Sequence, residues 1–303
     1  MKKYLPLGII FIILVAILSL VWLSFFKSSG RTATLEVKPG DGTMSIAKVL
    51  KTKKVIFSPF IFYSYVHARH LILQPGIYDL GSRLNLIQIV QKIASGDSSE
   101  VAVTIPEGYR LTQIDALLKE KNLIESGDLI KIASSDEGKL FPDTYRFKKD
   151  ATAEDIRKTM LDNFTKQTEN LHDGNVDREV LIIASIVERE AKFDDDRARI
   201  AGVYFSRLDI GMRLQADPTI QYAKGSWLPI TLSDYQNVSS PYNTYLHDGL
   251  PPTPICNPGI KSVQAALSPV KDGSLYFVSD SAGKAIFAKT LPEHNSNVRN
   301  LRK

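Results

Sequence analysis

The stretch Asp177 to Phe193, DREVLIIASIVEREAKF, decides how the C-terminal half of the chain folds. From Val180 to Val187 it is apolar at every position except Ser185. An apolar run of this length suits either a buried strand or a buried helix. We favour a helix, because Asp177 is a good N-cap, no Gly or Pro interrupts the run, and strong helix formers continue it. A helix that is apolar all round belongs in a protein core.

Two glutamates lie at the end of this predicted helix. At about 100° per residue, Glu190 falls on the face of Ile183 and Ile186, and Glu188 falls about 200° away from it. The two carboxyl groups therefore cannot act side by side, and at most one points into a given cleft. A carboxyl group in this position suits a general acid, because desolvation and the negative end of the helix dipole both raise its pKa. The alternative is a solvated last turn whose glutamates pair with Arg189, Lys192 or Arg197.

The composition narrows the class of protein. The chain has 303 residues, 44% hydrophobic and 23% charged, which suits two modest folded domains after an N-terminal segment. The net charge of +5 is spread along the sequence. Without an arginine-rich tract or a recognised motif, it predicts no nucleic-acid partner. Cys256 is the single cysteine, so a disulfide within the chain and a multi-cysteine metal site are excluded.

The N-terminal segment predicts a membrane anchor. Leu5 to Phe26 is a run of 22 residues without a charge. As a helix it would span about 33 Å, enough to cross a bilayer core. The short tail before the run favours a cytoplasmic N-terminus, and the end of the run offers no small-x-small cleavage site. We therefore expect an uncleaved, single-pass anchor rather than a cleaved signal peptide.

An internal repeat follows the anchor. Val37 to Ile56 (VKPGDGTMSIAKVLKTKKVI) and Ile105 to Ile124 (IPEGYRLTQIDALLKEKNLI) align without a gap at an offset of 68 residues. Each copy predicts a short strand, a Pro/Gly turn and a helix with apolar residues at i, i+3 and i+4. In the first copy these residues are Ile46, Val49 and Leu50.

Between the copies, Gly76 to Leu80 predicts a strand and Leu84 to Ala94 an amphipathic helix. The order of strands and helices resembles a LysM module, which binds N-acetylglucosamine polymers. A unit this small also recurs for purely structural reasons, so both interpretations stay open.

We expect an α+β fold with three parts. Residues 1–30 form a short cytoplasmic tip and a transmembrane helix at about 5–26. Residues 31–150 form the LysM-like region, a small α/β module that contains the repeat. Residues 151–303 form a mixed α+β catalytic domain.

Several elements of the last part are predicted from local patterns. Thr152 to Thr165 predicts a helix that buries Ile156, Met160 and Phe164. Ile200 to Leu208 predicts another helix, capped by the three aspartates at 194–196. The spacing of these aspartates matches no calcium loop, so we expect no metal site. Residues 275–278 and 285–288 predict two paired strands.

Three loops carry polar and aromatic residues: Gly211 to Thr219, Ser240 to Tyr245 and Gly249 to Gly259. Rigid loops rich in Tyr, Asn and Thr suit a carbohydrate cleft, and they equally suit a surface with ordinary turn chemistry. His294 is a lone histidine, which is more often structural than catalytic. Cys256 has no obvious base, so we do not expect a cysteine nucleophile.

Six stretches together resemble the bacterial MltG (YceG-like) endolytic murein transglycosylase family. In order, they are EGKLFPDTY (137–145), ASIVERE (184–190), GMRLQADPT (211–219), SPYNTY (240–245), GLPPTPICNPG (249–259) and His294-Asn295. The resemblance covers the chain from the anchor to its end. Thr253 departs from it, because we expect Gly after the paired prolines.

The resemblance implies cleavage of the β-1,4 bond between N-acetylmuramic acid and N-acetylglucosamine within peptidoglycan strands. The C6 hydroxyl of the muramic acid, rather than water, closes the new end as a 1,6-anhydro sugar. This chemistry needs one carboxyl group used twice, first as an acid and then as a base. Glu190 is the expected catalytic residue. Glu188 is the fallback, otherwise a supporting residue or a partner of Arg189 or Arg213.

Matched motif positions implied to bind sugar or to orient the acid are Gln215, Asp217, Tyr242, Asn243, Tyr245 and Asn257. We expect no cofactor. The implied partners are peptidoglycan strands, the membrane and the synthases that make new strands. An enzyme that cuts nascent strands would then release or terminate them. The implied location is the bacterial cytoplasmic (inner) membrane, with the bulk of the chain in the periplasm or outside.

Two other functions stay open. A hydrolytic muramidase would cut the same bond with water and would need a second carboxylate, for which Asp217 is the best candidate. A wall-binding scaffold without enzymatic activity would use the LysM-like region together with an inert second domain.

Overall fold

The computed structural model describes residues 25–171 and 176–301, together with Ile9, Phe11, Ile12, Val15, Ser19 and Trp22. Among the residues it describes, no helix is both long enough and apolar enough to cross a membrane. The predicted anchor, Leu5 to Phe26, lies mostly outside the described residues.

The chain divides into two compact units, residues 1–101 and 102–303. Both combine helices with short two-stranded sheets, as the α+β class predicts. The division falls earlier than the boundary expected near residue 150. The reason is that the second copy of the repeat packs within the second unit, and only its end lies near 150.

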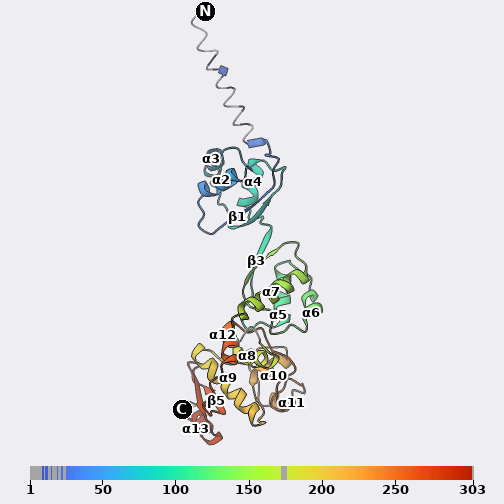
Figure 1. The fold of residues 1–303 in the computed structure, drawn as a ribbon, viewed down its shortest axis with the longest axis vertical. Helices are drawn as coiled ribbons and strands as arrows, with labels where there is room; N and C mark the ends of the chain where they lie inside the picture. The colour runs from blue at the N-terminus through green and yellow to red at the C-terminus, as the bar shows by residue number, and fades with distance from the viewer. Residues whose placement is uncertain are drawn as a thin grey trace, which may run out of the picture. The chain divides into compact units, whose positions relative to one another are not determined.

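The first unit is built on a strand-helix-helix-strand motif with one added helix. Its elements are β1 (Ala33–Val37), α2 (Thr43–Thr52), α3 (Pro59–Ala68), β2 (Gly76–Leu80) and α4 (Leu86–Ala94). β1 and β2 pair antiparallel, with Leu35 opposite Tyr78. Figure 1 shows the helices of this unit gathered beside the β1–β2 ribbon.

The apolar pattern of α2 explains its packing, with one correction. α2 buries Ile46, Ala47 and Leu50 in the core of the first unit. Val49, predicted on the same face, is 40% exposed. Ala47 takes the inner position, because it lies one residue after Ile46 and three before Leu50 on the helix.

The second copy repeats the same motif. Its elements are β3 (Glu100–Thr104), α5 (Leu111–Glu120), α6 (Asp128–Ala133) and β4 (Thr144–Lys148), and β3 pairs with β4. α5 and β4 begin and end 68 residues after α2 and β2, so the repeat extends well beyond the two aligned stretches.

Left-handed backbone positions recur at the same offset. The matched pairs are Gly40 with Gly108, Lys54 with Asn122, and His70 with Gly138. Lys54 and Asn122 are not glycines, yet they have φ values of 59° and 56°. Left-handed non-glycine residues are uncommon, so their recurrence indicates that the two copies share one backbone design.

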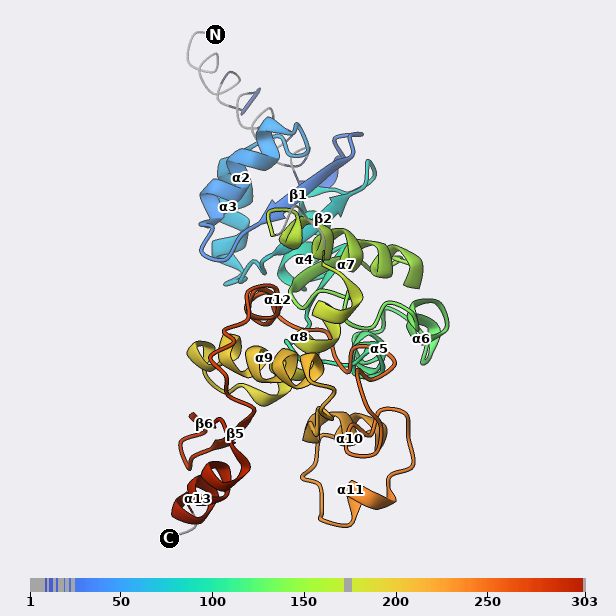
Figure 2. The ribbon, with the colours of Figure 1, turned by 60° about the horizontal axis from the view of Figure 1, so that its bottom comes forward.

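The rest of the second unit is mainly helical. Its elements are α7 (Ala153–Thr168), α8 (Arg178–Glu190), α9 (Asp194–Asp209), α10 (Asp217–Ala223), α11 (Asp234–Asn237), α12 (Ile260–Leu267), β5 (Tyr276–Ser279), β6 (Ala285–Ala288) and α13 (Leu291–Leu301). α12 packs against both α8 and α9, which lie side by side in Figure 2. As predicted, β5 and β6 pair, and α7 buries Ile156, Met160 and Phe164.

Helix α8 forms as the sequence predicts. The Asp177 side chain caps it by accepting a hydrogen bond of 2.8 Å from the Val180 N–H. Every residue from Leu181 to Val187 is buried. Each fully buried large aliphatic side chain contributes about 1.5–3 kcal/mol, so packing on all sides holds this helix in place. The helix ends at Glu190, because Ala191 takes an extended backbone.

Two local predictions were wrong. The three aspartates at 194–196 lie inside the first turn of α9, and Phe193 is the N-cap. Acidic residues in a first turn are favoured by the helix dipole, so they need not cap it. The polar loop expected to run to Thr219 ends earlier, because α10 begins at Asp217 with Pro218 in its first turn. Proline fits there, because the N–H groups of the first turn have no acceptor within the helix and proline lacks only that group.

Candidate active site

The second unit contains a cleft of about 380 Å³ at the end of α8. It is lined by Glu190, Tyr204, Arg207, Gln215, Asp217 and Tyr245, and by residues of β5 and α13 that include Tyr276 and His294. The cleft thus brings together four of the sequence-predicted site residues: Glu190, Gln215, Asp217 and Tyr245.

Glu190 is the last residue of α8 and is partly exposed in this cleft. Its Oε1 atom accepts a hydrogen bond of 3.0 Å from the hydroxyl of Tyr204, a buried residue of α9. Burial and, next, the charge of Asp217 raise the pKa of Glu190 to about 7, against the opposing effects of Tyr204 and Arg207. A carboxyl group with this pKa can both give and take a proton near neutral pH.

Asp217 lies at the start of α10 and is held by Tyr245. The Tyr245 hydroxyl donates a hydrogen bond of 2.6 Å to Oδ1 of Asp217. Burial and this carboxylate raise the pKa of Tyr245, which therefore keeps its proton. The aspartate side chain is thus fixed in the wall of the cleft.

Gln215 lines the cleft from a strained backbone. It is exposed and has a φ of 49°, a left-handed conformation that costs about 1 kcal/mol or more in a residue other than glycine. Its N–H donates a hydrogen bond of 3.2 Å to the Thr244 carbonyl, which holds this conformation. Residues with strained backbone conformations are often found at functional sites.

Arg207 of α9 joins two walls of the cleft. Its Nε atom donates to the Leu275 carbonyl at 2.7 Å, and its Nη1 atom donates to the Leu214 carbonyl. The first contact fixes the chain just before β5, and the second fixes the residue before Gln215. Beside Arg207, the Tyr276 ring stacks on His294 with ring centroids 5.5 Å apart.

Sequence reasoning missed Tyr204, Arg207 and Tyr276. The helix predicted from Ile200 to Leu208 includes Tyr204 and Arg207, but the sequence pattern assigned neither residue a role in a site. A signal was present, because Tyr204 and Arg207 are three residues apart and so share a helix face. An arginine on the buried face of a helix requires polar partners in the core.

Tyr242 and Asn243 do not line this cleft. The Tyr242 hydroxyl lies 2.7 Å from Oγ1 of Thr253, the residue that departs from the family pattern. Asn243 is fully buried; its side chain accepts from the Tyr245 N–H at 3.0 Å and donates to the Val238 carbonyl at 3.0 Å. It therefore supports the loop that carries Tyr245.

Asn257 also lies outside the cleft, fully buried against the second copy of the repeat. Its Oδ1 atom accepts hydrogen bonds from the N–H groups of Gly138 and Leu140, at 2.8 and 2.9 Å. Its Nδ2 atom donates to the Tyr109 carbonyl and to Oε1 of Glu137, at 3.0 and 2.9 Å. These four bonds use the whole capacity of the amide. A role in binding sugar stays a prediction for Asn257, as for Tyr242 and Asn243.

Glu188 points away from the cleft, as the helical spacing predicts. Its side chain is 7% exposed, and its Oε2 atom lies 3.4 Å from Nη1 of Arg197. The same oxygen accepts hydrogen bonds from the Gly259 N–H at 3.0 Å and the Ser262 hydroxyl at 2.8 Å. Of the partners predicted for Glu188, Arg197 is confirmed, and Arg189 and Arg213 were wrong. Glu188 joins α8 to the start of α12.

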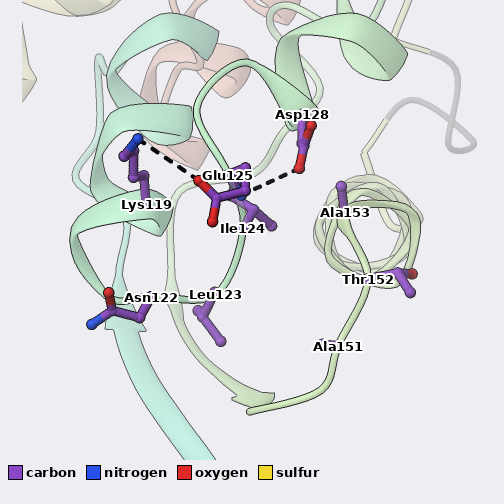
Figure 3. Close-up of a pocket in the computed structure, with 9 residues that line it drawn as sticks. All are labelled: Lys119, Asn122, Leu123, Ile124, Glu125, Asp128, Ala151, Thr152 and Ala153. Carbon is purple, nitrogen blue, oxygen red and sulfur yellow. Dashed lines mark hydrogen bonds and ion pairs between the residues drawn. The ribbon is translucent and has the colours of Figure 1, made fainter.

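A second pocket, of about 460 Å³, lies on the second copy of the repeat (Figure 3). Its polar lining includes Lys119 and Glu125, whose charged atoms are 3.9 Å apart and exposed to solvent. An exposed pair of this kind contributes little energy. The pocket contains none of the predicted site residues, so the cleft of Glu190 is the candidate active site.

Comparison with known proteins identifies the family of the chain. The sequence profile of the YceG-like family matches residues 35–300. The chain therefore belongs to the YceG-like family.

The alignments with related proteins cover most of the chain. It is 34% identical to an endolytic murein transglycosylase of Bacillus subtilis, across 89% of this chain and 84% of that protein. It is 28% identical to an endolytic murein transglycosylase of Streptococcus pneumoniae, across 89% of this chain and 58% of that protein. A crystal structure of a YceG-like protein from Listeria monocytogenes is similar, with a TM-score of 0.60, 35% identity, and coverage of 88% of this chain and 98% of that one.

The raised pKa of Glu190 predicts a pH-dependent cost to stability. Since its pKa is about 7 in the folded protein, against an ordinary 4.5, raising the pH through this window destabilises the fold. Glu190→Gln removes that cost. We expect it to raise Tm by about 2–4 °C at pH 8 and to change it little at pH 4, as measured by calorimetry. An equal shift at both pH values would contradict the raised pKa.

Proposed function

We propose that the chain is a lytic transglycosylase that cleaves the β-1,4 bond between N-acetylmuramic acid and N-acetylglucosamine inside peptidoglycan strands. Its membership of the YceG-like family and its relatives named endolytic murein transglycosylase support this class of enzyme. The observation that carries the proposal is Glu190, a carboxyl group of raised pKa that lines the cleft and accepts a hydrogen bond from Tyr204.

The mechanism uses Glu190 twice. Protonated Glu190 gives its proton to the glycosidic oxygen, the bond to C1 of the muramic acid breaks, and the N-acetylglucosamine end leaves as an alcohol. The Glu190 carboxylate then takes the proton from the C6 hydroxyl as that oxygen attacks C1, which closes the 1,6-anhydro ring and restores the acid. The Tyr204 hydroxyl donates to the carboxylate between the two steps and so stabilises it.

A second candidate function is hydrolysis of the same bond by water. It is favoured by one observation: the Asp217 charge acts on Glu190, and both residues line the same cleft. Two carboxyl groups on one cleft are the arrangement that ordinary glycosidases use. Here Asp217 would activate water, and the product would be a reducing end.

The membrane anchor and the cellular role complete the proposal. The uncharged run Leu5 to Phe26 would hold the N-terminus in the cytoplasm and the catalytic unit outside the cytoplasmic membrane. An anchored enzyme that cuts inside strands would release or terminate new strands beside the synthases. Release of the full-length chain from membranes by a carbonate wash would contradict the anchor.

We also propose that the first copy of the repeat binds glycan, in keeping with its resemblance to a LysM module. In the second copy, the matching surface holds the Asn257 amide through the Leu140 N–H, and Gly108 N–H donates to the Asn257 backbone carbonyl. The matched N–H groups in the first copy, Gly40 and Ile72, have no partner among the described residues. An N-acetyl group offers the same carbonyl acceptor and N–H donor as the asparagine amide.

Ile72→Pro tests this binding, because proline lacks the N–H. In the non-cleaving Glu190→Gln background, we expect Ile72→Pro to weaken binding to purified glycan strands, as measured by co-sedimentation. Ile72→Ala, which keeps the N–H, should bind like its parent, since the Ile72 side chain is 76% exposed. Equal binding by both variants would exclude this surface.

The products test the reaction. The full-length chain should release fragments with anhydro ends from purified peptidoglycan, one water lighter than hydrolysed ends by mass spectrometry. Glu190→Gln should lower kcat by at least about a hundredfold, since general acid catalysis contributes about that much. Glu179→Gln, an exposed change in the first turn of the same helix, is the control and should leave activity unchanged. Reducing ends would indicate hydrolysis instead.

The pH profile tests the protonation state. We expect kcat/KM to fall as the pH rises through about 7, because Glu190 must begin protonated. Asp217→Asn removes a charge that raises the pKa of Glu190, so the fall should move to lower pH. An unmoved profile would mean that another group sets the limit.

A further inference from the structure

A second charged cluster in the second unit lies outside the Glu190 cleft. Arg110 lies just before α5, Arg189 in the last turn of α8, and Trp227 in the loop after α10. The Cζ atoms of Arg110 and Arg189 lie 5.0 and 4.1 Å from the centroid of the Trp227 ring. The indole N–H donates to Oε1 of Gln113 at 3.0 Å, which fixes the ring.

Among the described residues, neither arginine forms an ion pair with a carboxylate. Nη2 of Arg110 donates to the Gly225 carbonyl at 2.7 Å, which satisfies a donor but brings no charge. The Arg189 side chain makes no hydrogen bond or ion pair with any residue that the structure describes. The Nε atoms of both arginines are buried without a partner. Both side chains and Trp227 are nevertheless partly exposed, so an anion can reach them.

The neighbouring carboxylates, Glu188 and Glu137, form hydrogen bonds or ion pairs with other groups. Glu188, one residue before Arg189, is bound by Arg197, Ser262 and the Gly259 N–H. Glu137 accepts from the Leu111 N–H and the Asn257 amide. Burial lowers the pKa of Arg110. Electrostatic interactions with Tyr222 and Glu137 oppose this shift, and repulsion from Arg189 adds to it. Two like charges that lack a directly paired carboxylate carry an electrostatic cost, which a bound anion would lower.

Packing on the indole explains only part of this arrangement. A cation over an aromatic ring is attracted by the negative face of the ring, and the C-terminal end of α8 favours a cation. Neither interaction uses the N–H donors of Arg189, which lie in the plane of its guanidinium group. Those donors match the two oxygens of a carboxylate.

We propose that Arg189 and Arg110 bind a carboxylate of the substrate, with Trp227 holding the guanidinium groups in place. The inference rests on the proposed function, since the carboxylates of peptidoglycan are carried by the peptide stems on muramic acid. Arg189 directly precedes Glu190 on α8, so the carboxylate it binds belongs to a stem close to the cleaved bond. The site therefore selects strands that carry stems with free carboxylates.

The test compares two substrates on the full-length chain: native strands, and strands whose carboxylates have been capped as methylamides. For the unchanged protein, we expect capping to raise KM about tenfold with kcat nearly constant, as the loss of one charged hydrogen-bonding pair predicts. Arg189→Gln should show the raised KM on native strands and no further effect of capping. Arg189→Lys keeps the positive charge but loses the two parallel N–H donors of the guanidinium group. Its KM on native strands should fall between that of the unchanged protein and that of Arg189→Gln.

Arg83→Gln is the matched control, because it removes the same charge from an exposed arginine of the first unit. It should keep the preference for native strands. The proposal is overturned if capping leaves the KM of the unchanged protein as it was, or if Arg189→Gln keeps the full preference.

Two further readouts keep the test decisive. If Arg189→Gln does not fold, as judged by its thermal unfolding, Arg110→Gln and the capped substrate still decide the question. If the unchanged protein cleaves neither substrate, the proposed function fails. Co-sedimentation with native and capped strands then still tests the carboxylate site, because it requires binding and no cleavage.

Discussion

Burial of α8 on every side is the constraint on which the rest of the second unit depends. A helix packed all round from Leu181 to Val187 cannot rotate or slide, so its last turn is fixed. Glu190 and Glu188 then leave the core in different directions. One meets Tyr204 in an open cleft, and the other is bound by Arg197 beneath α12. The same helix thus places one carboxyl group in a cleft and the other in a buried network of polar contacts.

The repeat shows how one small motif serves two purposes. In the second copy, the turn at Gly108 and the segment from Gly138 to Leu140 hold Asn257 by backbone hydrogen bonds. Asn257 belongs to a segment that contacts α8, because the Ile255 N–H donates to the Ser185 hydroxyl at 3.0 Å. The second copy therefore supports α8. In the first copy, the matching N–H groups of Gly40 and Ile72 have no partner among the described residues, and that of His70 donates to the His67 carbonyl.

Part of the fold and of the candidate site could be predicted from local sequence patterns. The Asp177 cap, the apolar run of α8 and the divergence of Glu188 from Glu190 follow from helical geometry, and the repeat follows from direct alignment. Long-range packing decided the rest. Tyr204 and Arg207 reach the cleft only because α9 packs against α8. Asn243 and Asn257 resemble ligand-binding residues by type, yet their amides bind backbone groups, and for Asn257 these lie more than a hundred residues away.

The most direct test of the account is the pKa of Glu190 itself. Infrared difference spectra between the unchanged protein and Glu190→Gln isolate the stretching band of the protonated Glu190 carboxyl group during a pH titration. Since Glu137, whose pKa is also raised to about 7, is present in both proteins, its band cancels. The account predicts a midpoint near 7 for Glu190. A midpoint near the ordinary value of 4.5 would contradict it, because Glu190 would then lack the proton that the first step needs.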